Sequence, residues 1–543
     1  NPKCYFAKTT GRSLPVYLID KEIYQKCPTV LVSTVDKFAR LPWSEQMGLL
    51  FGKADRYCPR HGYVADGDVC HKGKHYSDMT EGLEAVQLRE CRPFYPPELI
   101  IQDELNLLTG SIGTIYGGYE TVVEDLCTIE KDGKIIRPKY VASSTAVKNI
   151  GEQIHCLYDR KAYAQFAPNG YDARDSFFFR QVPLPSVNVG QADERQIRTM
   201  IRNNERPFRQ YAGICVSGQS VEDTLKKLYS AILRKVSELA RTEEYANYVS
   251  PYYSLIEYFN NIQTFSGTVR LIDDAAKSQI DLMRKAEGQT AGCFSCLKKE
   301  AAADTVTGGI IQRPPRNEET FDSTHDNNGF HDIFIADHMI AAGKNISCTE
   351  LMAIVGQPGK NLEYNQITNR VGQKYPSIIF MVYNPDQSWD MSHYENFIGF
   401  HSQMCRYVED SAATPFAARA RDQILHALVV SLIRLQYKNM ASNDKASHIR
   451  EMPDSDLHSV KQTILNRVRE VDPSACLDVA NEIDQFIRNW KETCKDNLNY
   501  YVCDTTTSSR LLNCFGETNK ENEIPTLTSM RGEEQKATLF YQL

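Results

Sequence analysis

The sequence predicts an α/β fold with mostly parallel strands. Short β-branched or aliphatic runs alternate with helical patterns, and each run is apolar throughout, as is typical of strands covered on both faces. One helix is clear, because Val221, Leu225, Leu228 and Ile232 fall on one stripe after Ser220, which can cap its N-terminus. The predicted strands cover residues 29–33, 99–102, 140–142, 214–216, 333–336, 352–355 and 378–383.

The bulk composition is that of a globular protein with several domains. A length of 543 residues suggests about three or four domains at roughly 150 residues each. Hydrophobic residues make up 42% and charged residues 24%, which argues against a disordered or fibrous chain. The balance of 62 basic against 69 acidic residues gives a net charge of -7. The chain as a whole is therefore no basic nucleic-acid coat, and any nucleic-acid site must be local.

No membrane segment and no leader are expected. The longest apolar run, 427–433, ends at Arg434 and is far shorter than the roughly 20 residues that a membrane helix needs. The sequence starts at Asn1 without a charged and then apolar leader. Sixteen cysteines without a secretory signal favour reduced thiols, so we expect a cytoplasmic protein.

The pattern along the chain predicts three regions. Residues 1–190 form a first domain with an insertion at 55–95, and residues 191–400 form a second domain. An irregular insertion at 288–330 is rich in glycine, proline and asparagine. Residues 401–543 read as a mainly helical C-terminal extension that ends in an extended tail.

An acidic pair follows the predicted strand at 99–102. The stretch P-P-E-L-I-I-Q-D-E-L-N delivers Asp103 and Glu104 at the carboxyl end of that strand. There one carboxylate can hold the Mg²⁺ of a bound nucleotide, and its neighbour can polarise the attacking water. The alternative is a solvated turn, which an acidic pair after a strand also fits.

A second strand ends in small hydroxyl residues. The segment Y-V-A-S-S-T-A places Ser143, Ser144 and Thr145 directly after the strand at 140–142. In helicases such a segment links the nucleotide carboxylates to the second motor domain through hydrogen bonds. The alternative is a serine-rich helix cap.

A third hydroxyl-rich segment lies near the start of the chain. In V-S-T-V-D-K-F, residues Thr34 and Lys37 follow the predicted strand at 29–33. A hydroxyl, an ammonium group and helix N-terminal amides suit contacts to a phosphate backbone.

The insertion at 55–95 contains a candidate zinc site. Cys58 and His61 form a C-x-x-H motif, and Cys70 and Cys91 can complete a tetrahedron. Two more histidines lie nearby, His71 and His75. The alternative is a set of buried free thiols.

Nucleophilic catalysis has little support. The chain has no G-x-S-x-G motif and no convincing Ser, His and Asp arrangement. His426 lies within an apolar helical pattern, which favours a core histidine over a catalytic base.

Many motifs in order resemble one family. The chain resembles, from about residue 15 to its end, the helicase subunit of DISARM phage-defence systems. The matching motifs are L-V-S-T-V-D-K-F-A, C-P-R-H-G-Y, P-P-E-L-I-I-Q-D-E-L, G-G-Y-E, S-S-T-A, Y-D-A-R-D-S-F-F-F-R, E-Y-N-Q-I-T-N-R-V-G-Q-K-Y-P, D-M-S-H-Y-E, T-P-F-A-A-R-A-R-D and T-S-M-R. The resemblance implies two RecA-like superfamily 2 helicase motor domains, the first incomplete at its N-terminus, with a helical C-terminal extension. It also implies ATP and Mg²⁺ as cofactors and ATP-driven action on single- or double-stranded DNA with a protein partner subunit.

The chain also departs from the family pattern. Gln366 and Arg370 match the nucleotide-facing part of the last motif. Asn106, however, stands where the family has a histidine, Asn345 where it has an aspartate and Gln373 where it has an arginine. Losing an arginine that neutralises the transferring phosphate costs a factor of about 10³ to 10⁵ in rate.

Two hypotheses about function remain open at this stage. No G-x-x-x-x-G-K-[ST] phosphate loop occurs in the sequence, and in the family that loop lies upstream of residue 1. The first hypothesis is a DNA-binding helicase subunit that is weak or inactive in ATP hydrolysis alone, and the second is a catalytically inactive scaffold. A phosphate-loop lysine upstream would favour the first. An RNA-directed motor is a third candidate, because backbone contacts do not separate DNA from RNA.

Overall fold

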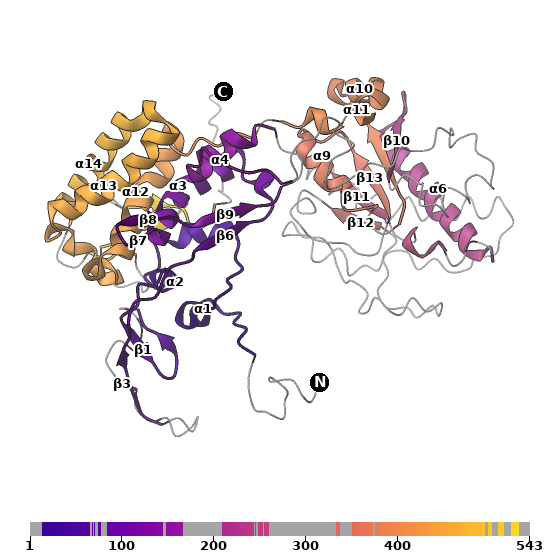
Figure 1. The fold of residues 1–543 in the computed structure, drawn as a ribbon. Helices are drawn as coiled ribbons and strands as arrows, with labels where there is room; N and C mark the ends of the chain where they lie inside the picture. The colour runs from indigo at the N-terminus through magenta and orange to yellow at the C-terminus, as the bar shows by residue number, and fades with distance from the viewer. Residues whose placement is uncertain are drawn as a thin grey trace. The chain divides into compact units, whose positions relative to one another are not determined.

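The chain divides into two units, which are described separately. Unit 1 comprises Asn1–Ala164 and Asp410–Leu543, and unit 2 comprises Gln165–Glu409 (Figure 1). The computed structural model describes residues 14–65, 68, 70, 74–75, 77, 84–144, 148–166, 209–243, 245, 248–252, 255–259, 333–336, 350–372, 375–402, 404–409, 411–494, 498–501, 509–514 and 523–530. In this part of the chain, no helix combines the length and apolar character that crossing a membrane requires.

Unit 2 is built on a five-stranded parallel sheet. Its strand order is β10-β14-β13-β11-β12, and every neighbouring pair is parallel. The elements are β10 (Arg209–Cys215), α6 (Val221–Arg241), η7 (Ser250–Tyr252), β11 (Leu255–Phe259), β12 (Ile333–Ala336), β13 (Leu351–Val355), α9 (Asn361–Thr368), β14 (Ser377–Tyr383), α10 (Ser388–Glu395), α11 (Phe397–Ser402) and η11 (Met404–Tyr407). The predicted α/β class with parallel strands is confirmed for this unit.

Helices cover both faces of this sheet, which explains the uniformly apolar strands (Figure 1). On β11, Leu255 and Phe259 pack with residues of α6, whereas Ile256 and Tyr258 pack on the opposite face with residues of α9 and α11. The predicted cap of α6 is also confirmed, because the Ser220 side chain accepts a hydrogen bond of 3.0 Å from the Asp223 N–H.

Strand β11 was not predicted, because Glu257 interrupts its apolar run. All five of its residues are buried, and Glu257 is fully inaccessible to solvent. No described residue bonds either carboxyl oxygen of Glu257. Burial therefore raises the pKa of this carboxyl well above its ordinary value, and the group stays protonated.

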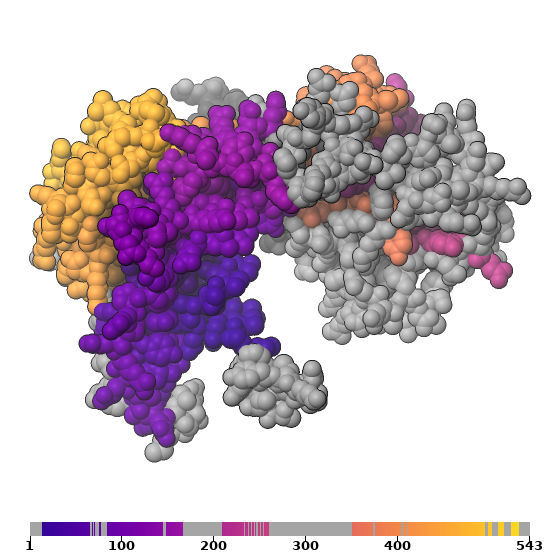
Figure 2. All heavy atoms as spheres, viewed as in Figure 1, coloured from indigo at the N-terminus to yellow at the C-terminus, as the bar shows by residue number. Residues whose placement is uncertain are grey.

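Unit 1 joins the first 164 residues to the C-terminal helices. Helix α3 packs against α4 and α12, and α12 also contacts α13 and α14. One hydrophobic core runs through all of these helices, so the helices predicted as a C-terminal extension share the core of the first region. Figure 2 shows the C-terminal helices, in amber, in close contact with the purple N-terminal segment.

The elements of unit 1 are α1 (Asp20–Lys26), η2 (Val35–Arg40), α2 (Met47–Leu50), β1 (Arg56–Cys58), β2 (Gly62–Tyr63), β3 (Lys74–His75), β4 (Val86–Gln87), β5 (Arg89–Glu90), β6 (Leu99–Gln102), η4 (Leu105–Leu107), α3 (Gly110–Cys127), β7 (Ile129–Lys131), β8 (Lys134–Ile136), β9 (Lys139–Ala142), α4 (Ile150–Tyr158), α12 (Ala418–Gln436), η12 (Lys438–Met440), η13 (Asn443–Arg450), α13 (Asp454–Val471), η14 (Pro473–Ala475), α14 (Cys476–Thr493), β15 (Leu512–Cys514) and β16 (Ile524–Thr526).

Glycines let α3 approach its neighbours closely. A Cβ atom on Gly117 would lie 2.6 Å from Pro415 Cγ, and one on Gly118 would lie 2.2 Å from Ile424 Cδ1. Ile424 belongs to α12, most of which is buried. The sequence G-G in the middle of α3 is thus explained by helix contact.

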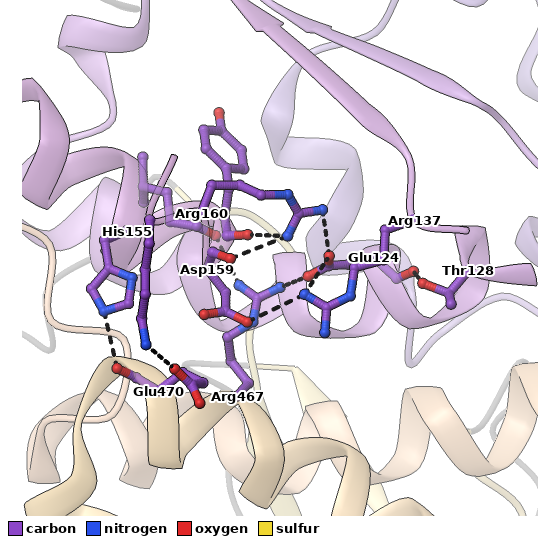
Figure 3. Close-up of polar contacts among 11 residues, drawn as sticks. Glu124, Thr128, Arg137, His155, Asp159, Arg160, Arg467 and Glu470 are labelled. Carbon is purple, nitrogen blue, oxygen red and sulfur yellow. Dashed lines mark hydrogen bonds and ion pairs between the residues drawn. The ribbon is translucent and has the colours of Figure 1, made fainter. Parts of the chain in front are cut away.

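A buried ion-pair network joins α3 to α13 (Figure 3). Glu124 of α3 pairs with Arg467 of α13, and only 6% and 5% of these residues are exposed. The Arg160 guanidinium lies 2.6 Å from the same carboxylate, and Arg467 donates 3.0 Å to the Leu157 carbonyl at the end of α4. Three helices are therefore tied together at one carboxylate.

The C-terminal segment docks on the start of the chain. The Asp36 carboxylate accepts hydrogen bonds from Ser529 Oγ at 3.0 Å and from the Met530 N–H at 2.8 Å. Trp43 Nε1 donates to the Leu527 carbonyl at 2.9 Å. Two distant motifs of the sequence, V-D-K-F and T-S-M-R, therefore meet in space.

His426 is a core residue, as the sequence predicted. It is 8% exposed, and its Nε2 lies 2.9 Å from Thr526 Oγ1. Burial lowers its pKa to about 4, so it stays neutral near pH 7.

One predicted strand of unit 1 does not form, and two others form but keep apolar residues exposed. The run at 29–33 forms no strand, and Val30 and Val32 are exposed. Strands β6 and β9 form as predicted, but they pair only with each other in the described part of unit 1, and Leu99, Ile101 and Val141 stay exposed. The apolar residues of β6 and β9 are typical of strands inside a wider sheet that is covered on both faces. The sequence of a strand does not determine how many neighbours pair with it or which elements cover it.

We predict that Glu257→Met stabilises unit 2, and more so at higher pH. The folded-state pKa of Glu257 is raised, so the unfolded chain releases a proton above about pH 4.5 that the folded chain retains. Stability is thus lost as pH rises, and methionine removes that loss. Hydrogen exchange in β11, β13 and β14 should slow in the variant, with a larger difference at about pH 8 than at about pH 5. Exposed Glu395 is the control position, and faster exchange in Glu257→Met at both pH values would contradict the prediction.

We predict that Glu124→Leu destabilises unit 1 strongly. Removing one partner of a buried pair leaves Arg467 charged without its carboxylate, which typically costs about 3–5 kcal/mol. The double variant Glu124→Leu with Arg467→Met should regain most of that loss. Urea unfolding followed by the fluorescence of Trp43 and Trp490, both in unit 1, measures the difference. The exposed pair Lys161–Glu470 supplies the control, and an equal loss on breaking it would refute the buried network's role.

Candidate nucleotide and metal sites

Parallel pairing of β6 and β9 brings the acidic and hydroxyl motifs together. Gln102 pairs with Ala142, so the residues that follow both strands leave the sheet at the same edge. These residues are Asp103, Glu104, Ser143 and Ser144, all of which the sequence predicted as site residues. The carboxyl edge of a parallel sheet is where α/β proteins bind ligands.

Asp103 is held through one of its two carboxylate oxygens. Its Oδ1 accepts hydrogen bonds from Ser143 Oγ and, at 3.0 Å, from the Glu104 N–H. The residue is exposed, and within the described residues no donor reaches Oδ2. One oxygen is thus fixed while the other faces solvent.

Glu104 adopts a left-handed backbone conformation. Its φ angle is 53°, which is uncommon for a residue with a side chain. Its N–H points at both Asp103 Oδ1 and Ser143 Oγ, the latter at 3.3 Å. Such strained backbone persists where surrounding contacts hold it, and it concentrates at functional sites.

Buried side chains support the turn behind the acidic pair. Gln153 of α4 is fully buried, and its Nε2 donates to the Leu105 and Leu108 carbonyls, both at 3.0 Å. Asn106 Oδ1 accepts a 3.1 Å hydrogen bond from Ser144 Oγ. Sequence analysis missed Gln153, although a glutamine among the apolar residues of a short helix is a signal for a buried support.

Thr34 and Lys37 lie near the start of η2 and are accessible. The Lys37 ammonium forms a 2.5 Å ion pair with Asp20 of α1, and both side chains are about half exposed, at 42% and 56%. Thr34 precedes η2 without capping it through its side chain. The Lys37 ammonium is thus accessible to solvent, and the Asp20 carboxylate balances part of its charge.

Gln366 and Arg370 lie in unit 2, on α9 and just after it. Gln366 is only 6% exposed, and its Nε2 has no acceptor among the described residues. The remaining predicted positions, Thr145, Asn345 and Gln373, lie outside the described residues, as does the insertion at 288–330.

Three of the four predicted zinc ligands come together, and the fourth does not. Ligand atoms of Cys58, His61, Cys70 and His75 all lie within 4.8 Å of one another. Cys91 instead packs with Leu49, Ala54 and Ala65 in a separate apolar cluster. Spacing alone could not choose between Cys91 and the nearby histidines, because the choice depends on how β3 pairs with β4.

Comparison with known proteins yields one strong match. The chain is 39% identical over 548 residues to the DISARM protein DrmA of Bacillus paralicheniformis. The alignment covers 99% of this chain and 46% of that protein, so the chain spans about half the length of this relative. No family model matches the chain.

Similarity to solved structures is weak. The DUF1998 helicase MrfA bound to DNA gives a TM-score of 0.33 at 14% identity, covering 62% of this chain and 35% of that chain. The helicase Lhr of Mycobacterium smegmatis bound to ssDNA and AMP-PNP gives 0.35 at 11% identity, covering 68% and 36%. Scores at this level do not establish a shared fold.

Proposed function

Since the chain is homologous along its length to a DISARM protein, as its motifs predicted, we propose that it is a helicase-like, DNA-binding subunit of an anti-phage defence complex. Its acidic edge would face the Mg²⁺ of a bound ATP, and it would work with a protein partner subunit. By itself the chain would hydrolyse ATP weakly or not at all. The observation that carries the proposal is the contact of Asp103 with Ser143 at the carboxyl ends of two parallel strands.

The arrangement of Asp103 suits a hydrated magnesium ion. Magnesium in nucleotide sites usually keeps several waters and takes one or two carboxylates together with substrate phosphates. A carboxylate with one oxygen held by Ser143 and the Glu104 N–H can offer its other oxygen to such an ion without rotating. The protein would thus position the charge before the nucleotide binds.

Glu104 would orient the attacking water. The left-handed conformation turns the Glu104 backbone N–H toward Asp103 Oδ1, so this contact does not use the Glu104 carboxylate. The Glu104 carboxylate would then serve the water while the Asp103 carboxylate serves the metal. In unit 2, Gln366 and Arg370 would contact the nucleotide, as the resemblance implies, and the unbonded Nε2 of Gln366 supports this assignment.

Hydrolysis would nevertheless be impaired. The sequence has no phosphate loop, and Asn345 and Gln373 replace an aspartate and an arginine of the family pattern. Phosphoryl transfer depends mostly on positioning and charge neutralisation, so these losses act on the same transition state. A scaffold that keeps the helicase architecture without turnover is the second candidate, and the same substitutions favour it.

We predict that the 543-residue chain shows no DNA-stimulated ATP hydrolysis above that of Asp103→Asn. A phosphate-release assay with and without DNA measures this. With a phosphate loop supplied by a longer form of the protein, Gln373→Arg should raise the rate if the rest of the site is intact. Hydrolysis by the present chain at about one per second or faster, the usual range for phosphoryl-transfer enzymes, would overturn the weak-motor proposal. No gain from Gln373→Arg would favour the scaffold.

We predict opposite effects of two substitutions on DNA binding. Lys37→Ala should weaken binding evenly across DNA sequences and lower the salt slope by about one unit, because one phosphate contact is lost. Asp20→Ala should strengthen binding, because it frees the Lys37 ammonium from its 2.5 Å ion pair. Fluorescence anisotropy over a range of salt concentrations measures both. If neither variant changes the affinity of a chain that binds DNA tightly, the DNA site lies elsewhere.

A further inference from the structure

We propose that Cys58, His61, Cys70 and His75 bind one structural zinc ion that holds together a small module of unit 1. The module, called here the zinc module, comprises the described residues between 55 and 91. It contains a three-stranded antiparallel sheet, β2-β1-β5, and the antiparallel pair β3-β4. The ligands come from the β1–β2 hairpin, from the segment before β3 and from β3 itself.

The four side chains converge as zinc ligands do. The Nδ1 atom of His61 lies 3.6 Å from Cys58 Sγ and 3.1 Å from Cys70 Sγ. The Nε2 atom of His75 lies 2.8 Å from Cys70 Sγ. Zn–S bonds of about 2.3 Å and Zn–N bonds of about 2.0–2.1 Å place tetrahedral ligand atoms about 3.3–3.8 Å apart. Small side-chain shifts would therefore close the four groups around one ion.

The composition of the site selects zinc. Two thiols and two imidazoles form the Cys₂His₂ set of structural zinc sites, whereas magnesium and calcium prefer oxygen ligands. Both cysteines are free thiols and are almost fully buried, at 0% and 2% exposure. Four protein ligands leave no open position, so the ion would be structural rather than catalytic.

The apolar packing directly around the site is small. Among the described residues, the buried members of this cluster are Cys58, Val64 and Cys70, with Val86 and Leu88 packed against them. Two of the three buried residues are themselves proposed ligands. A local core of this size is typically fixed by a metal or a disulfide.

The zinc module also supports α1. Gly62, next to His61, has a φ angle of 115°, and a Cβ atom there would lie 2.1 Å from the Gln25 carbonyl oxygen. Lys26 Nζ donates to the Arg60 carbonyl at 3.4 Å. The hairpin turn that carries His61 therefore presses directly on α1, which also carries Asp20, the partner of Lys37. Zinc would thus fix the turn on which α1 rests.

Cys91 provides a matched control. It lies in the same module, but it packs in a different cluster and donates its backbone N–H to the Asp55 carbonyl at 2.8 Å. Cys91→Ser changes the same atom as Cys58→Ser without touching the proposed site. A difference in metal content between these two variants therefore reports the site itself and not the loss of a thiol.

The test is the metal content of the purified full chain, measured by inductively coupled plasma mass spectrometry after growth with added zinc. We expect one zinc per chain in the wild type and in Cys91→Ser, and only background zinc in Cys58→Ser and His75→Ala. Absence of zinc from the wild type, or its loss from Cys91→Ser but not from Cys58→Ser, would overturn the assignment.

A second measurement covers the case in which the ligand variants do not fold. The wild-type chain is stripped with a chelator and titrated with Co²⁺, which should give the intense visible bands of a tetrahedral thiolate site and lose them when Zn²⁺ is added. Hydrogen exchange should also quicken in the β1–β2 hairpin and in α1 on stripping, and slow again with Zn²⁺. Weak octahedral cobalt bands, or a peptide in which Cys58 and Cys70 are joined by a disulfide, would refute the proposal.

Discussion

The pairing of Glu124 with Arg467 is the contact on which unit 1 depends. Both residues are almost inaccessible to water, and removing one partner of a buried ion pair is strongly destabilising. Glu124 lies on α3 and Arg467 on α13, and the two residues are 343 positions apart in the sequence. The pair therefore joins the C-terminal helices to a helix from the N-terminal part of the chain.

The same network sets the position of the acidic edge. One turn before Glu124 on α3, Glu120 accepts a 2.5 Å hydrogen bond from the Tyr140 hydroxyl of β9, and burial raises the pKa of Glu120 to about 7. Arg467 also bonds the last turn of α4, the helix from which Gln153 holds the turn behind Asp103. The candidate site residues are thus supported by β9 and α4, and both of these elements are anchored to α3. Precision at an exposed site comes here from buried polar contacts behind it.

The sequence predicted elements well where the local pattern decides them, and poorly where a distant partner does. Strands β6 and β12 have the predicted bounds, because a short apolar run ended by polar residues is typical of a parallel strand. Strand β11 was missed, because a single buried glutamate hides the apolar pattern, and only the covering helices make its burial possible. The run at 29–33 has an equally good pattern but forms no strand, because backbone pairing requires a neighbour that its own residues cannot specify.

The candidate sites divide in the same way. The motifs predicted Asp103, Glu104, Ser143 and Ser144 as site residues, and the parallel pairing of β6 with β9 brings all four to one edge. The support from Gln153, and the docking of Ser529 and Met530 on Asp36, depend on tertiary packing that no spacing shows.

The zinc module shows how the side chains that the fold brings together can differ by one residue from those that spacing predicts. A tetrahedral ion needs four donors at fixed distances, and the C-x-x-H motif brings two of them into one turn whatever the rest of the fold does. The other two arrive on separate segments, so pairing of His75 with Val86 across β3 and β4 decides which side chain faces the first two. Cys91 follows β5, whose Arg89 and Glu90 pair with β1, and its thiol ends in the apolar cluster of Leu49 and Ala54. The proposed ligand set thus depends on strand register. In the same register, the turn that carries His61 packs against α1 at Gly62. Helix α1 also carries Asp20, which pairs with Lys37.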